Sequence, residues 1–127
     1  MLEFWQCASP LWHSRQSHSR ESIRLIHHAY DLGINLIDNA NRYTGGVAEE
    51  IHGRAMKGRR TDFVVATKLV KRVGHRPNDE GLSRVHIMQE VENILRRLDT
   101  DYVDLLQAHD CGLGHAAGRN AACLLTT

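Results

Sequence analysis

The chain has 127 residues, of which 42% are hydrophobic and 24% charged, and its formal net charge is +1. This is the composition of an ordinary globular domain, and a charge so close to zero argues against a nucleic acid or a membrane surface as partner. No apolar run is long enough to span a membrane, and three cysteines without a Cys-x-x-Cys pair favour a reducing, cytoplasmic setting over a disulfide or zinc scaffold.

The first regular pattern follows an irregular N-terminal segment, residues 1–18, in which at most a short strand at Phe4–Ala8 is expected. Ser19 is predicted to cap a helix, and Gly33 stands where the end of that helix favours a positive φ. The apolar run Ile34–Ile37 then predicts a short strand.

A second helix and a second strand are predicted in the middle of the chain. Val47, Ile51 and Ala55 recur every four residues, which is the spacing of one helix face. The β-branched stretch "FVVAT", 63–67, predicts a strand buried on both faces, with Lys68 directly after it.

A third pair follows a long loop rich in Gly, Pro and Asn. Ser83 is predicted to cap the helix. One continuous apolar face is expected on it, made of Ile87, Met88, Val91, Ile94, Leu95 and Leu98. The stretch "YVDLLQA", 102–108, predicts the last strand, with His109 at its end. Strands that alternate with helices indicate an α/β fold of βα units around a parallel sheet.

Four titratable residues lie at or just after the predicted strand ends: Asp38, Tyr43, Lys68 and His109. In a (β/α) barrel the C-terminal ends of the strands form the rim where chemistry gathers, so these side chains are expected to meet. A phenol has a reference pKa of about 10, which a neighbouring ammonium lowers. The group therefore suits proton donation by Tyr43 to a carbonyl oxygen, with Lys68 and Asp38 behind it and His109 orienting the substrate.

Three segments around these residues carry a resemblance to a known family. They are "GINLIDNANRYTGGVAEEIHGRAM", "VVATK" and "GLSRVHIMQEVENILRRLDTDYVDLLQAHD". Together, over residues 19–110, they resemble the aldo-keto reductase family. The patterns Gly-Leu-Ser-Arg and Arg-Leu-x-x-Asp-Tyr-x-Asp are the most specific parts of the match.

The resemblance implies a fold, a reaction and a set of site residues. The implied fold is a partial (β/α)8 TIM barrel of about three to four βα units. The implied reaction is the NADP(H)-dependent reduction of a small aldehyde or ketone to an alcohol. The implied catalytic residues are Asp38, Tyr43, Lys68 and His109, and Asp38 is also implied to contact the cofactor. No metal is implied.

Four positions depart from the family pattern. Asn39 replaces a Thr, and Thr44 stands where a Gly usually follows the tyrosine. Ala48 replaces a Ser that would cap a helix. His52 replaces an apolar Leu, which predicts an imidazole on a buried helix face.

Length is the largest departure, because a complete barrel needs about 250 residues. The chain is expected to be a truncated form, with a half barrel at 19–110 and an irregular tail at 111–127 that is unlike the family. Open sheet edges then predict self-association. The alternative function is a catalytically inactive fragment, or an interaction module derived from a reductase.

Overall fold

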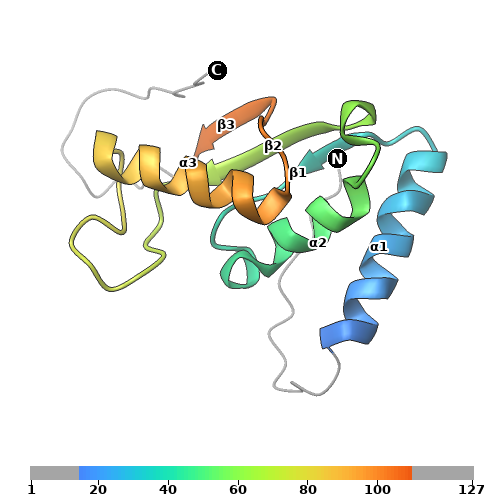
Figure 1. The fold of residues 1–127 in the computed structure, drawn as a ribbon, viewed down its shortest axis with the longest axis horizontal. Coiled ribbons are helices and arrows are strands. Elements are labelled where there is room, and N and C mark those ends of the chain that lie inside the picture. The colour runs from blue at the N-terminus through green and yellow to red at the C-terminus, as the bar shows by residue number, and fades with distance from the viewer. Residues whose placement is uncertain (1–14, 110–127) are drawn as a thin grey trace.

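The computed structural model of the chain describes residues 15–109, in which helices and strands alternate. The order is α1 (Arg15–Asp31), β1 (Leu36–Asp38), a 3-10 turn η1 (Tyr43–Gly46), α2 (Val47–Met56), a 3-10 turn η2 (Arg60–Asp62), β2 (Val64–Leu69), α3 (Arg84–Leu98) and β3 (Leu105–Ala108). The predicted α/β fold of βα units is confirmed (Figure 1). The expected strand at Phe4–Ala8 and the expected irregular tail at 111–127 lie outside the described residues.

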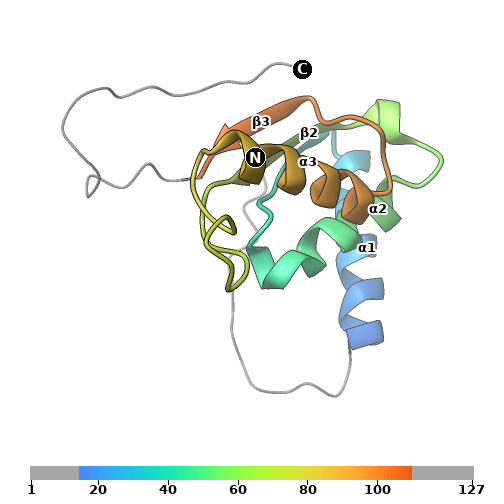
Figure 2. The same ribbon diagram turned by 60° about the vertical axis from the view of Figure 1, so that its left-hand side comes forward.

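The sheet is parallel, with β2 between β1 and β3. Asp38 pairs with Ala66, and Lys68 pairs with Gln107, so the C-terminal ends of all three strands lie at one edge of the sheet. Figures 1 and 2 show the three helices on one side of this sheet. Within the described residues, β1 and β3 are therefore edge strands.

The core lies between the sheet and the helices. Its buried members are Ile26, Ile37, Ala55, Met56, Phe63, Val65, Leu69, Ile94, Leu98, Val103 and Leu106. The residues of β2 that face the helices, Val65 and Leu69, are almost fully buried, whereas Val64 on the other face is 43% exposed. The prediction of a strand buried on both faces is thus wrong at Val64, because the described helices cover one face only.

The end of α1 follows the prediction, but its start does not. The amide of Ile34 donates to the Ala29 carbonyl at 3.0 Å and that of Gly33 to the Tyr30 carbonyl at 2.8 Å, with Gly33 at φ +88°. This pair of bonds is the Schellman arrangement that glycine permits. The predicted Ser19 cap is wrong, because α1 begins at Arg15 and Ser19 is buried inside the helix.

Helix α3 confirms the predicted cap and corrects the predicted face. The Ser83 hydroxyl accepts a hydrogen bond from the His86 amide at 3.2 Å. The buried row of the helix is His86, Glu90, Ile94 and Leu98. Met88, predicted to be on the buried face, is 50% exposed. Polar His86 and Glu90 occupy the row at the N-terminal half, and this displaces Met88 to the side of the helix.

Strand boundaries differ from the prediction by a few residues at each strand. β1 begins at Leu36 rather than Ile34, and β3 begins at Leu105 rather than Tyr102. Lys68 lies inside β2 rather than after it, because the strand continues to Leu69 in register with β3. Pairing with the neighbouring backbone, and not the length of the apolar run, sets these limits.

Candidate active site

The four predicted site residues come from three strands and the turn after the first of them. Asp38 is the last residue of β1, Lys68 is the second-last residue of β2, and His109 directly follows β3. Tyr43 is the first residue of η1, which precedes α2. Because the strands are parallel, all of these positions lie at the same edge of the sheet.

The side chains of these residues converge at that edge. The Lys68 ammonium Nζ lies 2.5 Å from Asp38 Oδ1 and 3.0 Å from the carbonyl oxygen of Asn39. The same nitrogen lies 5.6 Å from the centre of the Tyr43 ring. The Tyr43 and His109 rings meet edge to face, with centroids 5.6 Å apart and planes at 89°. The carboxylate, the ammonium, the phenol and the imidazole therefore form one continuous group.

The group is accessible from outside. The side chains of Lys68 and Asp38 are 17% and 16% exposed, and Tyr43 and His109 are half-buried. A fully buried ion pair would leave no room for a ligand, whereas this one retains an open side. The arrangement can accept a small polar group, donate hydrogen bonds to it and supply a proton.

The backbone between β1 and Tyr43 is held against β2. The Asn39 amide donates to the Ala66 carbonyl at 2.9 Å, and the Asn41 amide donates to the Lys68 carbonyl at 2.9 Å. Both bonds continue the pattern of the sheet beyond the end of β1. The path of the chain toward Tyr43 is therefore fixed by the strand that carries Lys68.

Two of the departures from the family pattern contact each other beside the site. Asn39 Nδ2 lies 2.9 Å from His52 Nδ1, and the Asn39 Oδ1 accepts the Ala40 amide, which sets the orientation of the side chain. His52 Nδ1 also lies 2.7 Å from the Ala48 carbonyl. A single ring nitrogen serves one of these neighbours at a time: unprotonated, it accepts from Asn39, and protonated, it donates to Ala48.

His52 is buried on α2, as the sequence predicts. Burial lowers the pKa of its imidazole, although the contact with the Ala48 carbonyl acts in the opposite direction. The neutral ring is therefore favoured, and it is the neutral ring that can accept from Asn39. Sequence reasoning identified His52 as buried but missed the contact, because the two residues are 13 positions apart.

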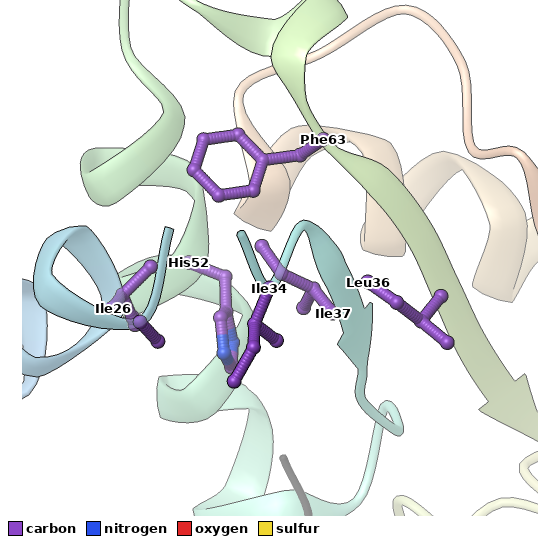
Figure 3. Close-up of a pocket in the computed structure, with 7 residues that line it drawn as sticks. Ile26, Ile34, Leu36, Ile37, His52 and Phe63 are labelled. Atoms are coloured by element: carbon purple, nitrogen blue, oxygen red, sulfur yellow. The ribbon is translucent and has the colours of Figure 1, made fainter. Parts of the chain in front are cut away.

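A small cavity lies between α1, β1 and α2. Its lining is apolar except for His52 and includes Ile26, Ile34, Ile37 and Phe63 (Figure 3). Its volume is about 10 Å³, roughly the space of one water molecule. None of the four site residues lines it, so this cavity is a packing gap in the core and not the place where the four residues meet.

Within residues 15–109, no group of three or more His, Cys, Asp or Glu side chains is arranged to hold a metal ion. No helix in the same range has both the length and the apolar character that crossing a membrane requires.

Comparison with known proteins gives a consistent result. A family model described as "Aldo/keto reductase family" matches residues 8–115. The chain is 39% identical over 110 residues to "Aldo-keto reductase YhdN" of Bacillus subtilis, covering 85% of this chain and 33% of that protein. It is 47% identical over 93 residues to "Probable voltage-gated potassium channel subunit beta" of Oryza sativa, covering 71% of this chain and 28% of that protein.

The solved structure of the aldo-keto reductase AKR11C1 from Bacillus halodurans (holo form) is similar in fold. The TM-score is 0.65 at 37% sequence identity, over 72% of this chain and 31% of that one. The chain thus spans about a third of the length of the relatives it matches. Its parallel sheet with helices on one side resembles part of the barrel of such proteins.

Proposed function

This chain belongs to the aldo/keto reductase family, and from that membership we propose that it acts in the NADP(H)-dependent reduction of an aldehyde or ketone to an alcohol. The observation that carries the proposal is the Lys68–Asp38 ion pair, whose ammonium Nζ lies 5.6 Å from the centre of the Tyr43 ring. A proton donor and the charge that assists it are thus neighbours at an open edge of the sheet.

Tyr43 is the proposed proton donor. Reduction of a carbonyl group requires a proton at oxygen as a hydride arrives at carbon. The Tyr43 hydroxyl delivers that proton, and the ammonium of Lys68 stabilises the negative charge that develops on the phenol oxygen. The close approach of Lys68 to the Tyr43 ring supports this assignment.

Asp38 is proposed to keep Lys68 charged and oriented. Its carboxylate contacts the ammonium at 2.5 Å, while the Asn39 carbonyl accepts a second hydrogen bond from the same nitrogen. Two fixed acceptors restrict a flexible side chain to one position. Charge-assisted hydrogen bonds of this kind are about twice as strong as neutral ones.

His109 is proposed to orient the substrate. An imidazole N–H can donate to a carbonyl oxygen, which polarises the carbonyl bond and fixes its direction. The edge-to-face contact between the His109 and Tyr43 rings makes the two side chains direct neighbours. One substrate oxygen can then receive a hydrogen bond from His109 and a proton from Tyr43.

The chemistry of the residues at this edge suits a nucleotide cofactor. The Asp38 carboxylate retains 16% exposure and can accept hydrogen bonds from cofactor hydroxyl groups. NADP(H) bound there would supply the hydride. The chain's own residues hold the carbonyl group, exclude alternative orientations of it and deliver the proton at the Tyr43 oxygen.

The test uses the 127-residue chain and a fluorescence titration with NADPH, followed by turnover of an aryl aldehyde. We expect NADPH to bind and Tyr43→Phe to lower turnover by about 10²–10⁴-fold with unchanged NADPH affinity. Tyr102→Phe, which removes an exposed phenol elsewhere, is the matched control and should keep full turnover.

Two results would overturn the proposal. Full turnover in a folded Tyr43→Phe variant would remove Tyr43 from the role of proton donor. If the fluorescence titration shows no binding at saturating NADPH, the chain is a catalytically inactive member of its family, which is the alternative that the sequence raises.

A further inference from the structure

A cluster of three charged side chains lies on the helix side of the sheet; its two carboxylates are buried and its arginine side chain is 23% exposed. Glu49 of α2 is 0% exposed and Glu90 of α3 is 5% exposed. Arg97 lies between them, with its Nε 2.6 Å from Glu49 and its Nη2 3.6 Å from Glu90. Burial raises the pKa of Glu49, although the hydrogen bond from Thr67 and the charge of Arg97 act to lower it.

Such a cluster is poorly explained as a source of stability. Taking charges out of water costs free energy that a buried ion pair often fails to recover, and apolar residues of similar size are frequently as stabilising. The cluster is better explained by the neighbouring groups that its three side chains hold in place.

Two of those contacts reach the chain next to the proposed catalytic residues. Asn41 Nδ2 donates to Glu90 Oε2 at 2.8 Å, and Asn41 lies two residues before Tyr43. The Thr67 hydroxyl donates to Glu49 Oε1 at 2.7 Å, and Thr67 directly precedes Lys68 in β2. Both Asn41 and Thr67 are buried, so these hydrogen bonds are shielded from water.

A third contact reaches the turn that Tyr43 begins. A Cβ atom added to Gly46 would lie 2.7 Å from Cδ of Arg97, which shows that the arginine stem packs directly on the backbone of this turn. Thr44, Gly45 and Gly46 have φ values of 52°, 65° and 93°. Only Thr44 carries a cost for its positive φ, since glycine adopts this conformation freely, and no side-chain cap hydrogen bond supports η1 or the start of α2. The Arg97 stem thus adds a contact from α3 to a turn whose other support is its own backbone hydrogen bonds.

We propose that Arg97, held between Glu49 and Glu90, is a positioning residue that sets the place of the Tyr43 hydroxyl at the active-site edge. The cluster contacts the chain on both sides of Tyr43: Glu90 accepts a hydrogen bond from Asn41, and the Arg97 stem packs on Gly46. This inference rests on the proposed function for its catalytic consequence, whereas the placement of the Tyr43 ring can be measured without any turnover.

The test labels the tyrosines with 3-fluorotyrosine in the 127-residue chain and assigns the Tyr43 resonance by its loss in Tyr43→Phe. Arg97→Lys keeps the positive charge and the aliphatic stem as far as Cδ, but it loses the planar fork, including the Nε and Cζ atoms that would lie 3.1 and 3.6 Å from a Cβ at Gly46. We expect the Tyr43 fluorine signal to shift or broaden in this variant. Glu90→Gln keeps an acceptor for Asn41 but removes the negative charge that faces Arg97, so it should change the Tyr43 signal in the same way and to a smaller extent.

The matched control is Arg60→Lys. Arg60 also pairs with a carboxylate, Asp104 at 2.7 Å, but it lies at the opposite end of β2 from Lys68. This variant should leave the Tyr43 signal unchanged. Where the chain turns over, Arg97→Lys should lower kcat by about tenfold to a hundredfold with KM changed less than kcat, because a displaced proton donor affects the chemical step.

The outcomes separate this inference from the proposed function. An unchanged Tyr43 signal in folded Arg97→Lys and Glu90→Gln overturns the positioning role even if the chain is an active reductase. A shifted signal that the Arg60→Lys control does not share supports the role even if the chain shows no turnover. If Arg97→Lys does not fold, Glu90→Gln decides on the same signal.

Discussion

Thr44 is the residue at which the backbone of the site can be tested most simply. It has φ 52° and ψ 32°, the left-handed conformation, and it follows Tyr43 directly. This conformation costs a residue with a Cβ atom about 1–2 kcal/mol, and a β-branched side chain is especially disfavoured there. Thr44→Gly removes that cost.

The expected gain can be worked out from two opposing effects. Glycine adds conformational freedom to the unfolded chain, which offsets about 0.4–1 kcal/mol of the relief. The midpoints of the two ranges leave a net stabilisation of about 0.8 kcal/mol. The Thr44 side chain is exposed, so little packing is lost.

The matched control makes the same chemical change at Thr61, in η2. Thr61 is also exposed, but its φ is not positive. Glycine at this position therefore only adds conformational freedom to the unfolded chain and should lower the free energy of unfolding. Urea denaturation should show a higher midpoint for Thr44→Gly and a lower one for Thr61→Gly, with equal m-values. Equal destabilisation by the two substitutions would refute the left-handed conformation at Thr44.

Three other substitutions test the packing and the electrostatics. Gly53→Ala should destabilise by about 1–3 kcal/mol in urea denaturation, because the new Cβ would lie 2.5 Å from the Leu98 carbonyl oxygen; an unchanged midpoint would mean that α2 and α3 pack less closely. The pKa of His52 is lowered from 6.5 in the folded chain, so the unfolded state binds the proton more readily. The free energy of unfolding should therefore decrease as the pH falls below 6.5, by at most about 1.4 kcal/mol per pH unit. His52→Leu should make the loss between pH 7 and pH 5 less steep, and parallel profiles would contradict this. Asp38→Asn should lower reductase turnover and change the free energy of unfolding only slightly, because the partly exposed ion pair with Lys68 serves mainly to orient the ammonium. Turnover equal to that of the unchanged chain would remove that role.

The parts of the fold that could be predicted are those with a local physical cause. Gly33 ends α1 because a positive φ is needed there, and Ser83 caps α3 because its hydroxyl can satisfy a free amide. The positions of Asp38 and Lys68 at one edge followed from the rule that parallel strands share their C-terminal ends.

The parts that could not be predicted depend on partners distant in the sequence. Glu90 reads as a surface residue of an amphipathic helix, and it is buried because Asn41 and Arg97 supply its hydrogen bonds and charge. The Asn39–His52 contact likewise needs the fold before it can be seen. Nothing local at Ser19 shows that α1 begins earlier, since a residue able to cap a helix can also lie within it.

The most direct test of the account is whether Tyr43, Lys68 and His109 are neighbours in solution. Nuclear Overhauser contacts can be measured from the Tyr43 ring protons to the His109 ring protons and to the Lys68 ε-methylene. The account predicts contacts to both, because the two rings meet edge to face and the ammonium lies beside the phenol. A folded chain in which the Tyr43 ring shows neither contact would contradict the proposed active site.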